Sequence, residues 1–177
     1  MASTNKTTHL KLNQWIATDP VLRTDFNFDN NKVDAAVNDR SLVRLETGTL
    51  TASKGLVSIH LGDYDLTQYM ELQVYWFPKT TAVSASDGAM TSLIVNGLSN
   101  ETNLSRMAAD GSRGLILHLC LLPGGLGGQY TVSGGSESGS FFVAGMTAVG
   151  LQSLGLKCGD GGSYLAGSRY GVYGLKG

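Results

Sequence analysis

The stretch Glu-Leu-Gln-Val-Tyr-Trp-Phe at residues 71–77 indicates the fold class of this chain most directly. Its apolar residues Leu72, Val74 and Trp76 occupy every second position, which is the period of a β-strand with one face in a core. Pro78 follows and ends the strand, because proline has no backbone N–H to donate to a sheet. The alternation places Trp76 on the core face, so we expect a core residue there rather than a sugar-stacking platform.

The same period of two recurs along most of the chain after residue 40. Val57, Ile59 and Leu61 form one further alternating stretch. Other strands are predicted at residues 45–50, 91–96, 114–122, 130–133, 140–145 and 164–175. Glycine-containing turn clusters separate these strands, as in the PGG of residues 123–125. The pattern predicts a mainly β fold over residues 41–177, an antiparallel β-sandwich of the jelly-roll type.

Glycine is unusually frequent in this chain, with 24 glycines against 3 prolines among 177 residues. The excess is therefore assigned to turns, bulges and close backbone packing in a folded domain, and not to a disordered linker. The GGLGG segment of residues 124–128 lacks the lysine that a phosphate-binding loop requires.

Residues 1–40 have a different pattern and are predicted to form a separate attachment segment: an extended arm and one short helix. Residues 25–39 contain neither glycine nor proline, and Phe26, Val33 and Val37 share one face of a helix. Thr24 or Asp25 is predicted to cap its N-terminus.

The predicted helix has a narrow apolar stripe and about four turns, so it would be marginal alone in water. It needs a partner, either identical helices around an axis or the neighbouring domain. Trp15 and Val21 in the preceding arm are apolar without periodicity, which indicates that the arm lies on another surface.

The low charge and the short apolar runs argue against nucleic acid and membranes as partners. Only 15% of residues are charged and the net charge is −1, so the chain offers no basic stripe for nucleic acid. No apolar run reaches the 18 residues of a membrane span, so no membrane insertion is expected. A chain with so few charges gains from burying surface in an oligomer.

Catalytic and metal-binding patterns are not found, and we predict that the protein is not an enzyme and holds no cofactor. No GxSxG nucleophile motif occurs, and Cys120 and Cys158 form no CxxC pair. Asp63 and Asp65 could offer oxygen ligands to calcium, but a solvated turn is the preferred interpretation.

Tyrosines near the C-terminus give the weak candidates for a receptor-binding site, because tyrosine suits half-exposed interface positions. These candidates are Tyr164, Tyr170 and Tyr173. Packing against the core is an equally good interpretation of each.

Residues 12–37 (LNQWIATDPVLRTDFNFDNNKVDAAV) resemble a segment of tail-fibre and minor structural proteins from phages of Gram-positive hosts. Those proteins share the pattern W-x3-D-x-V-x-R-x-D-F-N-x-D-x-x-K-I-D. The matching residues here are Trp15, Asp19, Val21, Arg23, Asp25, Phe26, Asn27, Asp29, Lys32, Val33 and Asp34. Residues 63–69 and 166–176 are similar to a loop and to the closing strand of β-sandwich domains in the same class.

The resemblance implies a homotrimeric virion protein, made in the bacterial cytoplasm and assembled into a phage particle. Residues 1–40 would attach it to other virion proteins, and the β-sandwich of residues 41–177 would form a distal tip that recognises a host-surface glycan. The expected attachment and trimer contacts are Trp15, Val21, Leu22, Arg23, Phe26, Asn27, Val33 and Val37. The chain lacks the shaft repeats of a long fibre, which favours a short one.

Two other functions remain open. A decoration or adaptor protein of the capsid or baseplate would share the fold without binding a receptor. A depolymerase of surface polysaccharide would need a longer groove and paired carboxylates.

Overall fold

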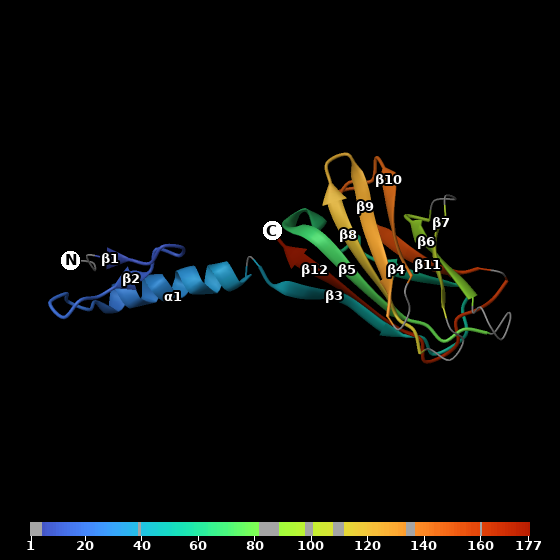
Figure 1. Ribbon diagram of the computed structural model, residues 1–177, viewed down its shortest axis with the longest axis horizontal. Coiled ribbons are helices and arrows are strands. Elements are labelled where there is room, and N and C mark those ends of the chain that lie inside the picture. The colour runs from blue at the N-terminus through green and yellow to red at the C-terminus, as the bar shows by residue number, and fades with distance from the viewer. Residues whose placement is uncertain are drawn as a thin grey trace. The chain divides into compact units, whose positions relative to one another are not determined.

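The computed structural model describes residues 5–38, 40–81, 89–97, 101–107, 112–133, 137–159 and 161–177 (Figure 1). The chain divides into two compact units. One comprises Met1–Ser41 with Lys176–Gly177, and the other comprises Leu42–Leu175.

The larger unit is an antiparallel β-sandwich made of a six-stranded and a four-stranded sheet (Figure 1). Every strand pair with a defined register is antiparallel. The described strands are β3 (Leu42–Thr49), β4 (Leu56–His60), β5 (Tyr69–Phe77), β6 (Ala89–Val95), β7 (Thr102–Met107), β8 (Leu115–Leu122), β9 (Gly125–Val132), β10 (Ser138–Ala144), β11 (Ser153–Cys158) and β12 (Arg169–Lys176).

The order of these strands is that of a jelly roll. The six-stranded sheet places β3, β12, β5 and β8 side by side, and the four-stranded sheet runs β4, β11, β6, β7. The first described strand of the unit thus pairs with its last strand, and the second strand pairs with the last but one, as two folded Greek keys require. The β9–β10 hairpin continues the six-stranded sheet beyond β8. The predicted mainly β, jelly-roll-like sandwich is confirmed.

The core lies between the two sheets and follows the alternation in the sequence. Leu72, Val74 and Trp76 of β5 are at most 1% exposed, as predicted. Leucines of β8 and β11 pack on the same core from the two sheets. The outward residues of β5 are left on the outer face of the six-stranded sheet, and this face carries the candidate site.

Several glycines within the strands are covered by aromatic rings. A Cβ placed at Gly128 would lie 2.2 Å from the Phe141 ring, which belongs to its partner residue on β10. Gly48 and Tyr170 make the same kind of pair between β3 and β12, with a spacing of 2.5 Å. A ring thus occupies the space that a side chain on the glycine would fill. This accounts for glycine excess inside strands, where bulges were also expected.

The smaller unit contains one helix and a short hairpin. Helix α1 spans Arg23–Asn38. Strands β1 (Asn5–Lys6) and β2 (Asn13–Gln14) precede it in the sequence and pair with each other. The helix begins before Thr24 and Asp25, so the prediction that one of them caps it is wrong. Asp25 instead lies in the first turn, where a negative charge suits the helix dipole.

Two strands of the larger unit were not predicted, and one predicted strand is shorter. β7 and β11 lie at residues where the sequence shows no sustained alternation. The strand predicted at residues 164–175 begins only at Arg169, because Tyr164 leaves the ladder and makes isolated bridges with Lys54 and Thr80. β9 begins at Gly125, so it includes the last residue of the predicted turn at 123–125 and starts five residues before the strand predicted at 130–133.

Candidate functional site

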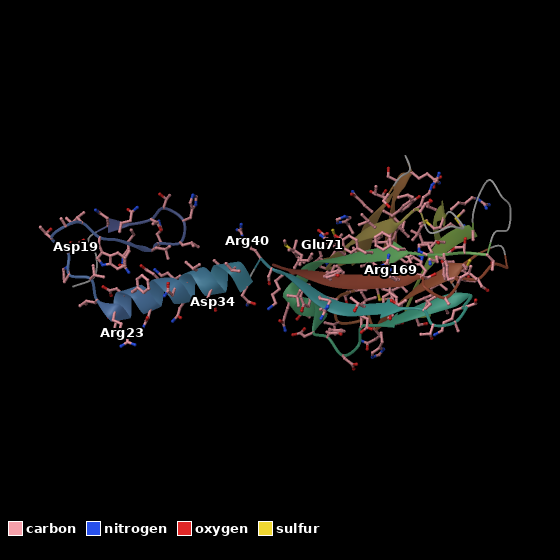
Figure 2. The ribbon with its side chains drawn as sticks, turned by 90° about the horizontal axis from the view of Figure 1, so that it is seen from below. Asp19, Arg23, Asp34, Arg40, Glu71 and Arg169 are labelled. Atoms are coloured by element: carbon pink, nitrogen blue, oxygen red, sulfur yellow. The ribbon has the colours of Figure 1, made fainter. Side chains whose placement is uncertain are left out.

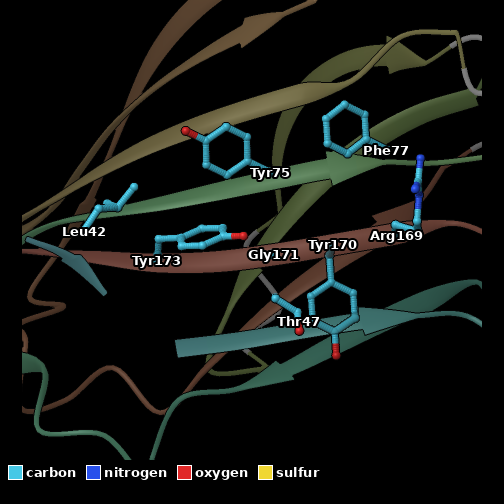
Figure 3. Close-up of a pocket in the computed structure, with 8 residues that line it drawn as sticks. All are labelled: Leu42, Thr47, Tyr75, Phe77, Arg169, Tyr170, Gly171 and Tyr173. Carbon is cyan, nitrogen blue, oxygen red and sulfur yellow. The ribbon is translucent and has the colours of Figure 1, made fainter. Parts of the chain in front are cut away.

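The outer face of the six-stranded sheet contains two hollows. The first, which we call the aromatic groove, has a volume of about 520 Å³ and lies over β3, β12 and β5 (Figure 3). Its lining residues are Leu42, Thr47, Tyr75, Phe77, Arg169, Tyr170, Gly171 and Tyr173. The second has a volume of about 570 Å³ over β5, β8, β9 and β10, and Glu71, His118 and Cys120 line it with residues of the hairpin. Both volumes are in the range of small-ligand sites.

Two rings of the aromatic groove lie against glycines. A Cβ on Gly114 would be 2.5 Å from the Phe77 ring, and a Cβ on Gly171 would be 3.0 Å from Tyr173. Tyr75 meets Tyr173 edge to face, with ring centroids 5.6 Å apart and an interplanar angle of 88°. The rings are therefore held by the sheet and by one another, and little rotamer freedom is lost when a ligand packs on them.

A chain of hydrogen bonds connects the two hollows. His118 Nδ1 is 2.6 Å from Glu71 Oε1, and Gln73 Nε2 donates to the same carboxylate oxygen at 3.0 Å. The Tyr75 hydroxyl donates to Gln73 Oε1 at 2.9 Å. Glu71 and Arg169 are both labelled on this unit in Figure 2. This series of hydrogen bonds fixes the direction of the Tyr75 hydroxyl, whose oxygen can still accept a hydrogen bond.

Tyr164 is not part of any binding surface, so its prediction as a receptor contact is wrong. It is 0% exposed, its ring is 4.8 Å from Trp76, and its hydroxyl lies 3.1 Å from Thr91 Oγ1. Burial raises the pKa of Tyr164 well above its ordinary value. Trp76 is a core residue, as expected.

Tyr170 and Tyr173 both line the aromatic groove, although their surroundings differ. Tyr170 is half-buried against the core, and its hydroxyl is 3.5 Å from Glu46 Oε1. Burial raises the pKa of Tyr170, and the neighbouring Glu46 carboxylate raises it further. Tyr173 points over Gly171 (Figure 3). Its hydroxyl makes no hydrogen bond with the residues that the structure describes, so it can meet a ligand.

The second hollow does not assemble a nucleophile. Glu71 orients the His118 ring, but within the described residues no hydrogen bond joins His118 to the exposed thiol of Cys120. A hydrogen-bonded base of this kind is one way in which a cysteine is activated, and His118 does not supply it to Cys120.

The Asp63–Asp65 segment forms a turn. Asp65 caps a 3-10 turn at Leu66–Gln68 and accepts a hydrogen bond from the Thr67 backbone N–H at 3.1 Å. Hydrogen bonds from the Gln68 side chain, and then from Thr67, lower the pKa of Asp65. Among the described residues no group of three His, Cys, Asp or Glu is arranged to hold a metal ion.

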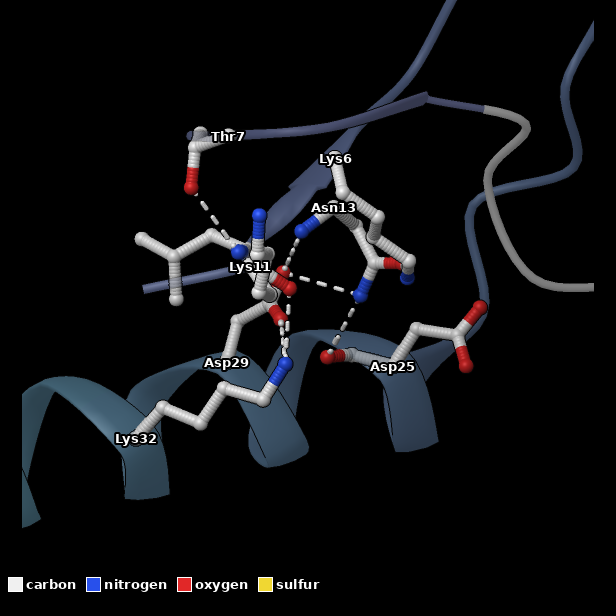
Figure 4. Close-up of polar contacts among 8 residues, drawn as sticks. Lys6, Thr7, Lys11, Asn13, Asp25, Asp29 and Lys32 are labelled. Atoms are coloured by element: carbon white, nitrogen blue, oxygen red, sulfur yellow. Dashed lines mark hydrogen bonds and ion pairs between the residues drawn. The ribbon is translucent and has the colours of Figure 1, made fainter. Parts of the chain in front are cut away.

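The N-terminal arm is fixed to α1 by polar contacts (Figure 4). Asp29 Oδ2 accepts hydrogen bonds from the backbone N–H and side-chain amide of Asn13 at 2.7 and 2.9 Å. Lys32 donates to the backbone oxygen of Lys11 at 2.7 Å. Asp29 is 8% exposed, whereas Arg23 and Asp34 project from the side of the helix away from the arm (Figure 2). The arm thus covers the side of α1 that carries Asp29 and Lys32.

A row of apolar side chains beside the arm is exposed, and we call it the apolar stripe: Phe26, Val33 and Val37 of α1, together with Leu22 directly before the helix. Their exposed fractions are 54%, 40%, 65% and 41%. Phe26, Asn30, Val33 and Val37 follow one another at steps of four, three and four residues, which is the spacing of a coiled-coil seam.

The other predicted attachment residues lie around this stripe and in the arm. Val21 is exposed, and Arg23 and Asn27 are exposed polar residues of α1. Trp15 is half-buried, and within the described residues its indole nitrogen has no hydrogen-bond acceptor.

Of the helices that the structure describes, none has both the length and the apolar character needed to span a membrane. Comparison of the chain with protein-family models, with curated proteins and with solved structures found no match in any of the three.

Proposed function

We propose that this chain is a phage virion protein, a short tail fibre or receptor-binding protein that attaches by residues 1–40 and recognises a host-surface glycan with its jelly roll. The observation that supports it best is the exposed apolar stripe of the smaller unit. The arm binds the adjacent side of α1 through Asp29 and leaves this stripe uncovered. Exposed apolar surface of this kind is typical of an assembly contact.

Three parallel copies of α1 would bury the apolar stripe around a threefold axis. Val33 and Val37 would lie in the seam with Phe26, and Asn30 would be the polar seam residue that selects register in coiled coils. Each arm would flank this seam, because it is bound through Asp29, which is one helical turn from both Phe26 and Val33.

Assembly is tested by the mass of the full chain in solution at low micromolar concentration. The wild type should have about three times the 18.7 kDa of one chain. Val33→Asp and Val37→Asp should return the monomer mass, because each places a charge in the seam. Asn31→Asp adds the same charge at an exposed position outside the stripe and should leave the trimer intact. A wild-type monomer would refute the trimer.

Receptor binding is tested with fluorescently labelled full chain on a panel of Gram-positive bacteria. Labelling of some strains is expected, with loss of label after wall glycans are stripped. If no strain is labelled and the chain is located on the capsid or baseplate of a particle, it is a decoration or adaptor protein. Release of sugar from the cell envelopes would instead identify a depolymerase.

A further inference from the structure

The rings of the aromatic groove are held in place by the sheet. Phe77 lies against Gly114 and Tyr173 lies against Gly171, so each ring is supported by a glycine on a neighbouring part of the sheet. Flat, fixed rings of this kind suit the apolar face of a sugar, since its C–H groups pack on an aromatic surface as other apolar groups do. Phe77 is 39% exposed.

One end of the groove is positively charged. Arg169 lines it beside Phe77 and is exposed, and in the described part of the chain its guanidinium has no ion pair (Figure 3). No carboxylate is among the lining residues. Glu46 is near the Tyr170 hydroxyl but does not line the groove. A free guanidinium beside rings favours an anionic group, which it can bind through two parallel hydrogen bonds.

The polar atoms of the groove also suit a saccharide. The Tyr75 hydroxyl donates its hydrogen bond to Gln73, so its oxygen is left to accept a hydrogen bond from a ligand hydroxyl. The Tyr173 hydroxyl can donate or accept a hydrogen bond. Arg169 and Tyr173 are four residues apart on one strand, which separates their Cα atoms by about 13 Å. That length exceeds a single hexose ring.

We propose that the aromatic groove binds an acidic saccharide, whose sugar rings pack on Tyr173 and Phe77 while a carboxylate or phosphate substituent pairs with Arg169. The proposal rests on the proposed function for its biological source, a host-surface glycan. The groove geometry alone supports the acidic class of ligand.

The test is calorimetric titration of the full chain with three probes: trigalacturonate, its neutral counterpart galactotriose, and a glycosylated glycerol phosphate trimer. At least one acidic probe should bind about 10-fold more tightly than galactotriose, and the tighter of the two identifies carboxylate or phosphate as the anion. Equal binding of all three, or no binding, overturns the proposal.

Variants assign any binding to the groove. Arg169→Gln should remove the preference for the acidic probe, and Tyr173→Ala should weaken all probes. Arg106→Gln removes the same charge from β7 of the opposite sheet and should change nothing. Unchanged binding by Arg169→Gln would place the site elsewhere and overturn the proposal.

Cys120 shows whether this sheet face is open in the assembled protein. It is exposed on the same face, while Cys158 is buried, so a thiol reagent should modify one cysteine rapidly. Protection of Cys120 in the wild-type assembly, lost in the Val33→Asp monomer, would identify the face as a contact between copies and overturn the proposal.

Cell labelling separates the two proposals. If Arg169→Gln labels cells as the wild type does, the receptor site lies elsewhere, so the groove proposal fails while the proposed function stands. If the wild type binds the acidic probe and labels no cells, the groove proposal stands and the receptor role fails.

Discussion

Tyr164 allows the most direct test of the jelly-roll core. Its ring packs edge to face on Trp76 at 4.8 Å and its hydroxyl reaches Thr91. Tyr164→Phe keeps the ring and loses one neutral hydrogen bond, which should lower the free energy of unfolding by about 1 kcal/mol. Tyr164→Ala also loses the buried ring and should cost about 4 kcal/mol, of which the edge-to-face contact supplies about 1 kcal/mol.

The assay is urea unfolding followed by tryptophan fluorescence in a Trp15→Phe background. The chain has 2 tryptophans, so Trp76, which touches Tyr164, becomes the only reporter. With a slope of about 2 kcal/mol per molar urea, the midpoint should fall by about 0.5 M for Tyr164→Phe and about 2 M for Tyr164→Ala. Tyr173→Ala, in the aromatic groove, should shift it by less than about 0.5 M.

The reasoning is refuted if Tyr164→Ala unfolds within about 0.5 M of the parent at an unchanged slope. A larger shift for Tyr173→Ala than for Tyr164→Ala would refute it as well, because it would place the stabilising ring on the outer face.

Three further predictions concern other parts of the chain. Asp29→Ala should release the arm from α1, at a cost of about 3 kcal/mol for two hydrogen bonds to a carboxylate, and hydrogen exchange of the arm amides should accelerate about 100-fold. Gly128→Val should displace the ring above it and lower the free energy of unfolding by about 2 kcal/mol, measured in urea. Tyr170→Phe should reduce the loss of stability above about pH 10, measured by urea unfolding at rising pH.

The sign of the last prediction follows from the raised pKa of Tyr170. Folding favours its neutral form, so this stabilisation is present below the pKa of the unfolded chain and is lost as pH rises through the higher pKa of the folded state. An identical alkaline profile for Tyr170→Phe would contradict it.

Each of the other two predictions has a control nearby in the chain. Asp34→Ala, on the exposed side of α1, should leave exchange of the arm unchanged. Gly124→Val should be tolerated, because nothing lies within 4 Å of a Cβ there. Equal effects of Asp34→Ala and Asp29→Ala would show that charge and not contact holds the arm.

The strands with alternating apolar residues could be predicted from the sequence. β5, β4 and β8 each bury one face, so apolar residues recur at every second position of these strands. β9 could not be predicted in this way. Its first four residues include three glycines, and the rings that pack on this part of the strand belong to β10. Because the apolar side chains over this part of β9 come from β10, the sequence of β9 shows no alternation of apolar residues.

The candidate site was only partly predictable. The sequence singles out Tyr173 as a candidate, but it does not indicate that Tyr75, Phe77 and Arg169 lie beside it. The missing information is the pairing of β5 with β12, strands far apart in the chain. One signal was present: Tyr75 and Phe77, the outward positions on either side of Trp76, are aromatic, where an exposed strand face usually carries polar residues.

The glycine–ring pairs have an evolutionary consequence. Gly48 with Tyr170, and Gly128 with Phe141, lie on adjacent strands, and each glycine is required only while its ring is present. Substitution of the glycine alone is penalised, whereas exchange of both members restores a side chain to each position and can be neutral. The two positions should therefore change together in descendants of this chain. Sequences that share its fold can in this way drift apart two residues at a time.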